Sequence, residues 1–309
     1  MRKKVSIIGA GNVGASLAEL VAREGLADVV ISDIAEGVPQ GKALDMSQAC
    51  APWGSSASVT GTNGFQETAG SDIIVITAGL ARKPGMSRDD LLKANASIIS
   101  GVTASAAKAS PEAVIIMVTN PMDVMAQIAL KVSGFSPERV IGMGGVLDSS
   151  RFRCFVAWEL GVSITDVEAL VMGGHGDSMV PMPRYTTVKG VPITELLPGD
   201  RVEALIERTR NGGAEIVAHL KTGSAYYAPA ASTYEMVRSV LLDQRRLLPC
   251  SVMLRGEYGI DGVYAGVPVV LGSGGVRKVM ELTLTEAESG LLRKSSEAVR
   301  SLMDKLGGD

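Results

Sequence analysis

The chain has 309 residues, enough for two domains with a large core, and its 46% hydrophobic and 20% charged content is typical of an ordered globular protein. A net charge of −3 without a long Lys/Arg tract excludes nucleic acid as an expected partner. The sequence has neither a secretory signal nor a run of roughly 18 apolar residues that would span a bilayer, so we expect no membrane association and a cytoplasmic location.

Short β-branched runs alternate with longer segments of helical periodicity through the first half of the chain. The expected strands are residues 4–8, 29–32, 73–77, 114–119 and 140–143, and the expected helices are 12–24, 37–49, 87–109 and 122–133. Apolar strands in this alternation are typical of a parallel sheet covered on both faces. We therefore predict an α/β fold whose first domain, residues 1–147, is a Rossmann-type doubly wound parallel sheet.

The pattern changes after residue 148 and predicts a second, α+β domain at residues 148–309 that binds the substrate. The expected helices are 149–160, 201–220 and 226–242, and the strand-like stretches are 167–172, 184–189, 250–257 and 267–271. A last amphipathic helix begins at Thr285, where Thr285 and Glu288 have the spacing of a capping box. No flexible linker separates the halves, so we expect the functional site in the cleft between them.

A glycine-rich turn follows the first expected strand and opens the first helix, reading Gly-Ala-Gly-Asn-Val-Gly at residues 9–14. This context is typical of dinucleotide binding: Gly9 permits the turn, Gly11 lets a pyrophosphate approach the backbone, and Gly14 permits close helix packing. Asp33 ends the second strand, where its carboxylate suits a ribose diol and repels a 2′-phosphate. These residues favour NAD over NADP, with a flavin or another adenine nucleotide as the alternative.

Arg82 and Arg88 flank a Pro-Gly pair just after the third expected strand. One guanidinium can neutralise a carboxylate while the other polarises an adjacent carbonyl, and Gly85 allows the segment to close over a ligand and exclude water. This arrangement indicates a small, doubly charged substrate. Asn120 ends another strand, at the sheet edge where ligands bind, and suits a nicotinamide ribose or the substrate; a turn-forming Asn-Pro is the alternative.

His175 lies between glycines, and the sequence contains only one other histidine, His219, which falls within an expected helix and is interpreted as structural. An imidazole exchanges protons near neutral pH, as oxidation of an alcohol requires; a loop histidine in a glycine-rich turn is the alternative. Asp148 and Arg151 are three residues apart on one helix face. Asp148 can orient His175 and Arg151 can bind a carboxylate, or the two can simply cap the helix and pair with each other.

These features occur together in one order and spacing. The chain resembles the lactate/malate dehydrogenase family over essentially its full length, through the turn at 9–14, Asp33, Arg82, Arg88, Asn120, Asp148, Arg151 and His175. The resemblance implies that His175 is the general acid and base and that Asp148 orients it. It also implies that Arg151 binds the C1 carboxylate and that Arg88 polarises the reacting carbonyl.

Within that family, arginine at the position of Arg82 resembles the malate-specific members and glutamine the lactate-specific ones. A second carboxylate sealed under a closed loop needs such a charge partner. The resemblance therefore implies an NAD-dependent oxidoreductase that interconverts (S)-malate and oxaloacetate, without a metal, as a homotetramer or homodimer. We also expect Asn12, Asn95, Thr119 and Asn120 to contribute to the cofactor site.

Other functions remain as alternatives. An L-lactate dehydrogenase or a broader 2-hydroxy acid dehydrogenase would share the same residues apart from the role of Arg82. An NAD-dependent glycosidase would need metal ligands, but Cys50, Cys154 and Cys250 are scattered and suit buried thiols in a reducing cytoplasm. A non-catalytic dinucleotide sensor would not need the pair of Asp148 and His175.

Overall fold

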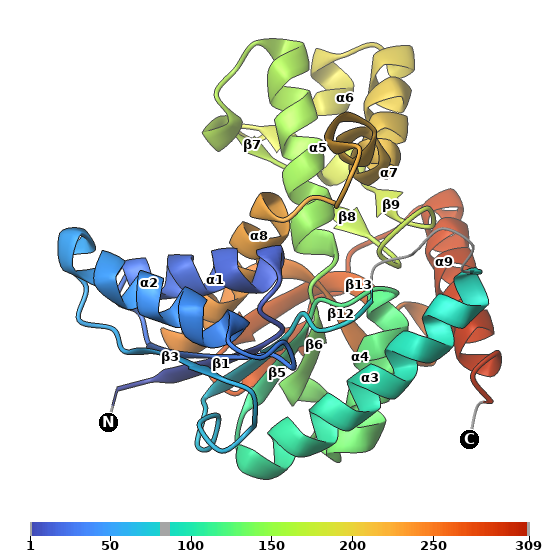
Figure 1. Ribbon diagram of the computed structural model, residues 1–309. Helices are drawn as coiled ribbons and strands as arrows, with labels where there is room; N and C mark the ends of the chain where they lie inside the picture. Colours follow the sequence, from blue (N-terminus) through green and yellow to red (C-terminus); the bar gives the residue numbers. More distant parts are fainter. Residues whose placement is uncertain (1, 81–86, 308–309) are drawn as a thin grey trace.

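One large sheet organises the protein in a computed structural model, which describes residues 2–80 and 87–307 (Figure 1). Within these residues the sheet has nine strands in the order β14-β13-β12-β6-β5-β4-β1-β2-β3. The first-half strands are β1 (Lys4–Ile8), β2 (Asp28–Ser32), β3 (Val59–Thr62), β4 (Ile73–Ile76), β5 (Val114–Met117) and β6 (Val140–Gly142). They pair in parallel, in the order of a doubly wound sheet, which confirms the predicted fold class.

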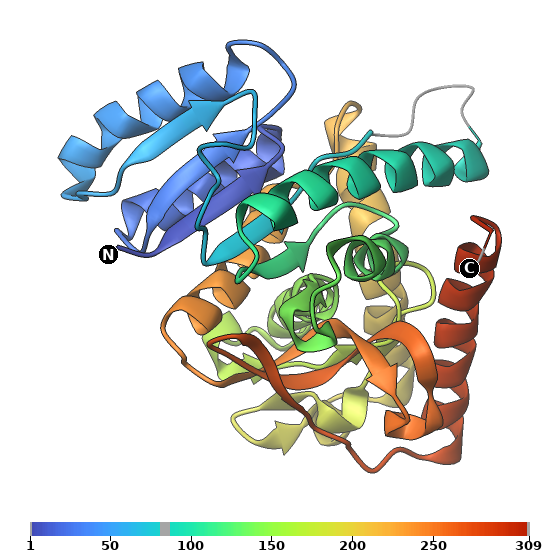
Figure 2. The same cartoon turned by 90° about the horizontal axis from the view of Figure 1, so that it is seen from below.

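Helices cover both faces of the parallel part (Figure 1). On one face lie α1 (Asn12–Arg23) and α2 (Val38–Trp53), and on the other lie α3 (Arg88–Ala109) and α4 (Met122–Ser133). The view from below shows α3 (teal) and α4 (green) on their shared face, with α2 (blue) and the C-terminal helix (red) at opposite ends of the molecule (Figure 2). Burial on both faces explains why β4 and β5, in the middle of the sheet, are apolar without alternation.

The sheet continues into the second half of the chain. The three further strands are β12 (Arg246–Arg255), β13 (Asp261–Gly272) and β14 (Gly275–Val279), all antiparallel. β12 joins β6 where Ser251 pairs with Gly142, and the buried Tyr264 hydroxyl donates to the Val140 carbonyl at 2.9 Å. The two halves are therefore connected by a continuous sheet rather than by a flexible tether.

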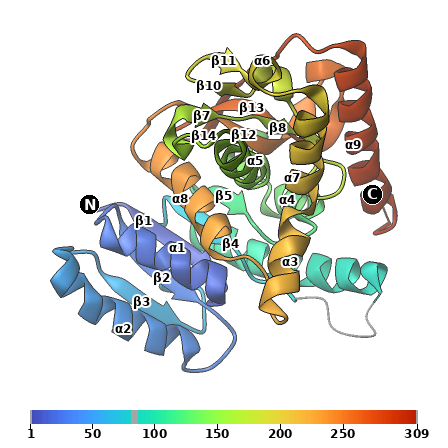
Figure 3. The same ribbon diagram turned by 90° about the horizontal axis from the view of Figure 1, so that it is seen from above.

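A smaller lobe stands on this sheet (Figure 1). It contains α5 (Gly145–Leu160), α6 (Ile193–Leu196) and α7 (Gly199–Leu220), with the short strands β7 (Val167–Glu168), β8 (Val171–Met172), β9 (Val180–Pro181), β10 (Thr187–Val188) and β11 (Val191–Pro192). A separate apolar cluster that includes Phe152, Val171 and Leu205 fills it. Seen from above, α5 lies between α7 and α8 (Tyr227–Leu241), and α8 packs on α1 (Figure 3).

The expected boundary between residues 147 and 148 falls inside α5, which begins four residues earlier than the periodicity indicates. The start of α5 was not predicted because Gly144 and Gly145 lie there, and consecutive glycines usually indicate a turn rather than a helix. The division of the chain into two domains at that point stays a prediction. The remaining short helices are 3₁₀ turns at Pro137–Arg139, Ile164–Asp166, Pro183–Tyr185 and Glu257–Gly259.

The last helix, α9 (Glu286–Asp304), has the capping box expected from its sequence. The Glu288 amide donates to the Thr285 hydroxyl at 3.2 Å, and the Thr285 amide donates to the Glu288 carboxylate at 2.8 Å. Arg184 adds two hydrogen bonds to the same carboxylate and holds the pKa of Glu288 at about 2. In the described part of the chain, no helix is both long enough and apolar enough to cross a membrane.

Candidate active site

The glycine-rich turn connects β1 to α1 and leaves open space where a pyrophosphate would bind. A Cβ on Gly14 would overlap the Gly9 carbonyl oxygen, and a Cβ on Gly9 would lie 2.6 Å from the Thr77 hydroxyl oxygen. A Cβ on Gly11, in contrast, would meet no described atom within 4 Å. Gly11 is also the N-cap of α1, which has neither a side-chain cap nor an acidic residue in its first turn. The helix therefore presents amides and a positive dipole end to an anion.

Two side chains hold the peptide of Ala10 inside this turn. The Asp33 carboxylate accepts from the Ala10 amide at 2.6 Å, and the Lys42 ammonium donates to the Ala10 carbonyl at 2.6 Å. The second oxygen of Asp33 accepts from the Ala35 amide at 2.9 Å. Asp33 thus stabilises the glycine-rich turn, and it also lies where we expect the ribose diol of a dinucleotide to bind.

A cavity of about 580 Å³ begins at this turn. Its lining includes three predicted residues, Gly9, Gly11 and Asp33, and also residues that the sequence did not single out: Ile34, Asn63, Phe65, Thr77, Ile98 and Val102. An anion-binding turn, a carboxylate for a diol and an apolar wall fit the phosphate, ribose and adenine parts of NAD. Isolated apolar residues in loops and helices form no motif, so the apolar wall of this cavity could not be predicted from the sequence.

The other predicted cofactor residues have different surroundings. Asn95 is buried and bridges two loops, because it accepts from the Leu80 amide at 2.8 Å and donates to the Asn120 carbonyl at 2.8 Å. Thr119 is also buried and donates to the Ala78 carbonyl at 2.7 Å. Asn120 itself is exposed after β5, before a cis peptide bond to Pro121, and Asn12 is the exposed first residue of α1. Direct contact of these four with a cofactor stays a prediction.

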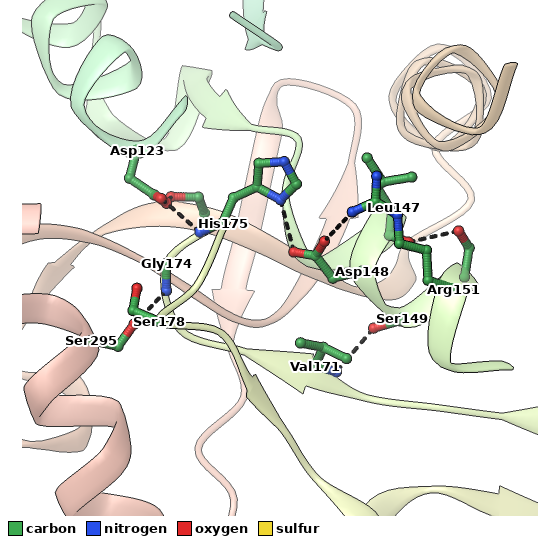
Figure 4. A network of polar contacts seen from close by, with 12 residues as sticks. Asp123, Leu147, Asp148, Ser149, Arg151, Val171, Gly174, His175, Ser178 and Ser295 are labelled. Atoms are coloured by element: carbon green, nitrogen blue, oxygen red, sulfur yellow. Dashed lines mark hydrogen bonds and ion pairs between the residues drawn. The ribbon is translucent and has the colours of Figure 1, made fainter. Parts of the chain in front are cut away.

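His175 and Asp148 are brought together from separate elements (Figure 4). His175 lies in the turn after β8, Asp148 lies in the first turn of α5, and the Nδ1 and carboxylate oxygen are 2.8 Å apart. Both side chains are largely buried, with exposed fractions of 13% and 2%. Because Nδ1 is used in this way, Nε2 is the ring nitrogen left for a substrate. A Cβ on Gly144, just beyond β6, would lie 3.1 Å from the His175 Cβ, so the pair sits at the carboxyl edge of the sheet.

The surroundings of His175 favour its protonated form. Burial acts to lower the pKa of the imidazole, but the charge of Asp148 and its hydrogen bond, together with the charge of Asp123, outweigh burial and raise the pKa above its ordinary value. The Arg151 guanidinium opposes this effect. These surroundings favour the protonated imidazole, the form that reduction of a ketone requires.

Arg151 lies beside the same carboxylate. Its Nη1 is 3.3 Å from Asp148, and its stem runs along α7, where a Cβ on Gly212 would lie 3.2 Å from the Arg151 Cδ. Its buried Nε has no hydrogen-bond partner among the described residues. Most of the donors of this guanidinium are therefore available for an anion, although the pairing with Asp148 that the sequence left as an alternative is also present.

Asp123 is a functional candidate that the sequence reasoning missed. It lies in the first turn of α4, is 5% exposed, and accepts from the His175 amide at 2.8 Å and from the Ser251 hydroxyl at 2.6 Å. In sequence it is a typical first-turn acid after a proline, and its partners are 52 and 128 residues away. Only the fold reveals this contact.

The side chains of the arginine pair predicted to bind the substrate lie outside the part of the chain that the structure describes. Arg82 lies outside the described residues, and Arg88 is the first residue of α3 with a side chain that is not described. Ser87 caps that helix in a capping box with Asp90. The roles of Arg82 and Arg88 stay predictions. Elsewhere, a cavity of about 970 Å³ between α3, α4 and α9 includes none of the predicted site residues.

Comparison with known proteins matches both halves of the chain. Residues 3–142 match the NAD binding domain of lactate/malate dehydrogenases, and residues 145–307 match their alpha/beta C-terminal domain. The chain belongs to the lactate/malate dehydrogenase family. A malate dehydrogenase from Thermomicrobium roseum is 57% identical over 306 residues, which cover 99% of each chain.

Solved structures of lactate/malate dehydrogenases agree with the fold. A malate dehydrogenase from Salinibacter ruber is 51% identical, with a TM-score of 0.94 over 98% of this chain and 97% of that one. A lactate dehydrogenase from Cryptosporidium parvum, solved with lactic acid and β-nicotinamide adenine dinucleotide, is 42% identical, with a TM-score of 0.96 over 100% and 99%. The predicted family, enzyme class and NAD-binding domain are confirmed.

The chain otherwise offers few groups for different chemistry. Cys50, Cys154 and Cys250 are all free, and burial raises the pKa of the Cys250 thiol far above its ordinary value. Within residues 2–80 and 87–307, no three His, Cys, Asp or Glu side chains gather as a metal site. The expectation of a metal-free reaction stays a prediction.

Proposed function

We propose that this lactate/malate dehydrogenase interconverts (S)-malate and oxaloacetate with NAD, and that His175 and Asp148 carry out its proton transfer. The observation that carries the proposal is the buried contact of 2.8 Å between Nδ1 and the carboxylate, at the sheet edge that also holds the glycine-rich turn. The malate dehydrogenases that are 52–57% identical over nearly the whole chain support the substrate.

The residues act as follows. NAD, when bound, supplies the hydride acceptor. During malate oxidation His175 accepts the hydroxyl proton at Nε2, while Asp148 keeps the Nδ1 proton in place and stabilises the imidazolium. Arg151 binds the carboxylate next to the reacting carbon through donors that Asp148 does not use. In the reverse direction the protonated His175 returns the proton to the oxygen of oxaloacetate.

Specificity for a dicarboxylate rests on Arg82, with Arg88 polarising the carbonyl. A guanidinium opposite the second carboxylate offsets the desolvation of that charge, which otherwise costs several kcal/mol. A substrate with a methyl group at that position leaves the guanidinium buried and unpaired. Discrimination against pyruvate should therefore span several orders of magnitude.

Initial rates of NADH oxidation with oxaloacetate, pyruvate and 2-oxoglutarate test the proposal directly. We expect kcat/KM for oxaloacetate to exceed that for pyruvate by about 10³ or more. Preference for pyruvate would instead support the second candidate, a lactate dehydrogenase, which the similarity to the Cryptosporidium parvum lactate dehydrogenase keeps open. NADH binding without turnover of any of the three would support a sensor.

The substitution Arg82→Gln tests the assigned charge partner. We expect turnover of oxaloacetate to fall by roughly 10² or more and the relative rate with pyruvate to rise, because the second carboxylate loses its counter-charge. The measurement is the ratio of kcat/KM for the two keto acids. An unchanged ratio would refute the role of Arg82.

We further propose a homodimer or homotetramer in the cytoplasm. Three free cysteines suit a reducing compartment. Trp158 and Tyr227 are large side chains with exposed fractions of 65% and 72%, as is common at subunit interfaces. Light scattering after size exclusion would give the mass; a monomer of 32.1 kDa would contradict the expected assembly.

A further inference from the structure

We propose that Asp123 is a positioning residue for the proton-transfer step: it holds the main chain of His175 and, as a second buried carboxylate, favours the protonated imidazole. This inference rests on the proposed function, in which His175 is the acid and base. It assigns a role to a buried acidic group that the pair of His175 and Asp148 leaves unexplained.

The side chain of Asp123 is a hydrogen-bond acceptor within the cluster, and Figure 4 shows its contact with the main chain of His175. One oxygen accepts from the His175 amide at 2.8 Å, and the other accepts from the Ser251 hydroxyl of β12 at 2.6 Å. An amide N–H can only donate, so at least one oxygen must accept. Burial, together with the charge of Asp148, raises the pKa of Asp123 above its ordinary value, although these two hydrogen bonds and the charge of His175 act in the opposite direction and favour the carboxylate.

The charge of Asp123 is not required by its hydrogen bonds. The carbonyl oxygen of an asparagine would accept from the His175 amide equally well, and the NH2 group would donate to the Ser251 hydroxyl oxygen. A buried carboxylate has a large desolvation cost that a neutral amide avoids. A carboxylate at this position is therefore best explained by what its charge does to the neighbouring imidazole.

The charges around His175 are unequal in sign. Asp148 and Arg151 face it from α5 and Asp123 faces it from α4, whereas the groups that α9 and β12 contribute to the same cluster are the uncharged hydroxyls of Ser295 and Ser251. Two carboxylates against one guanidinium favour the imidazolium. Arg82 and Arg88 are present both in the wild type and in any variant at position 123. A difference in the pKa of His175 between these two proteins therefore reports the change at position 123.

The turn that carries His175 has other supports, which allow the charge to be tested separately. The Gly174 amide donates to the Ser295 hydroxyl at 2.7 Å, and that hydroxyl donates to Ser178 at 3.1 Å. Gly173 and Gly266 exchange two backbone hydrogen bonds at 2.8 and 3.1 Å. Removing the charge of Asp123 should therefore leave the turn in place.

The variant Asp123→Asn tests the proposal through the titration of His175. The sequence has only two histidines, so NMR of isotope-labelled histidine in a His219→Gln background reports His175 alone. His219 is exposed near the end of α7 and lies outside the described network. We expect the pKa of His175 to fall by about one unit in the variant. The pH at which kcat/KM for oxaloacetate begins to decline should fall by the same amount, with KM for NADH unchanged.

Two further variants distinguish a charge effect from local disturbance. Ser251→Ala removes a hydrogen bond from the same cluster but keeps the carboxylate, and Asp45→Asn removes a charge from an exposed position on α2. The proposal predicts a smaller shift for Ser251→Ala and none for Asp45→Asn. Equal shifts for the Asn and Ser251→Ala variants, or an unchanged titration in Asp123→Asn, would overturn it.

The NMR titration also separates this proposal from the proposed function. If the wild type turns over none of the three keto acids, the proposed function is wrong, whereas the shift of His175 in Asp123→Asn can still be measured. If the wild type reduces oxaloacetate and the titration does not move, only the role of Asp123 is wrong.

Discussion

His175 and the turn that carries it are held at three different points by residues from three different elements. Asp148 of α5 contacts the ring, Asp123 of α4 contacts the amide of the same residue, and Ser295 of α9 contacts the preceding amide. A side chain that exchanges a proton with a bound substrate benefits from such a fixed position, because even a small displacement of the reacting groups lowers the rate of the reaction. Gly174 allows this close approach, because a Cβ there would lie 3.1 Å from the Ser178 hydroxyl oxygen and 3.4 Å from the Asp123 carboxylate.

The substitution Asp148→Asn should reduce kcat by about 10³ to 10⁴, because an amide can hold the ring with the proton on the wrong nitrogen and cannot stabilise the imidazolium. Stopped-flow measurement of oxaloacetate reduction gives the rate, and fluorescence titration gives the Kd for NADH, which should stay near the wild-type value. A loss of NADH binding of similar size would instead assign Asp148 a structural role.

The pH dependence should have opposite signs in the two directions. In the proposed mechanism oxaloacetate reduction needs the protonated His175, so its kcat/KM should be constant at low pH and fall as the pH rises through the pKa of His175. Malate oxidation needs the neutral ring, so its kcat/KM should fall as the pH drops through the same pKa. Since that pKa is raised, both midpoints should lie above about 6.5. Midpoints below this value would contradict the balance of charges around the ring.

At the scale of single elements, the glycine-rich turn shows that neighbouring glycines serve different purposes. Gly14 permits α1 to pack against the turn, whereas Gly11 leaves room for a ligand. Adding the same methyl group at each position should therefore change different properties.

Gly14→Ala should lower the free energy of unfolding by about 1–3 kcal/mol, because the added methyl overlaps the Gly9 carbonyl. Gly11→Ala should leave stability nearly unchanged and weaken NADH binding by about tenfold or more, because the methyl occupies the space expected for the pyrophosphate. Thermal unfolding and NADH titration of both variants provide the comparison. Equal effects on stability would show that Gly11 also has a packing role.

The sequence predicted most elements well where one physical signal dominates. The strands at 73–76 and 114–117 are uninterrupted apolar runs, and the start of α9 is marked by the capping box at Thr285. β3 (Val59–Thr62) was not predicted, because it is short and contains Gly61 between two threonines. In the site, the contact of Asp148 with His175 followed from their chemistry, whereas Asp123 and the apolar cavity wall depend on distant packing that no local pattern encodes.

At the scale of the whole molecule, the nine-stranded sheet makes the two halves interdependent. β12 covers the edge of β6, and α8 from the second half packs on α1. An isolated first half would expose both an unpaired strand edge and the apolar face beneath α8.

A fragment of residues 1–147 should therefore aggregate or bind NADH much more weakly than the whole chain, although it contains the complete glycine-rich turn and Asp33. Solubility and NADH titration of the purified fragment test this expectation. A soluble fragment with wild-type affinity would show that the N-terminal half folds independently of β12 and α8.

The junction between β6 and β12 also has a consequence for protein engineering. Ser251 pairs with Gly142 there and its hydroxyl donates to Asp123, which in turn accepts from the His175 amide, so this short stretch of β12 connects the coenzyme half to the turn that carries His175. A chimera can combine the coenzyme half of one relative with the remainder of another. Its residues at the junction of β6 and β12 must then be compatible with each other. Otherwise we expect His175 to be displaced, even though every residue that touches a ligand has been preserved.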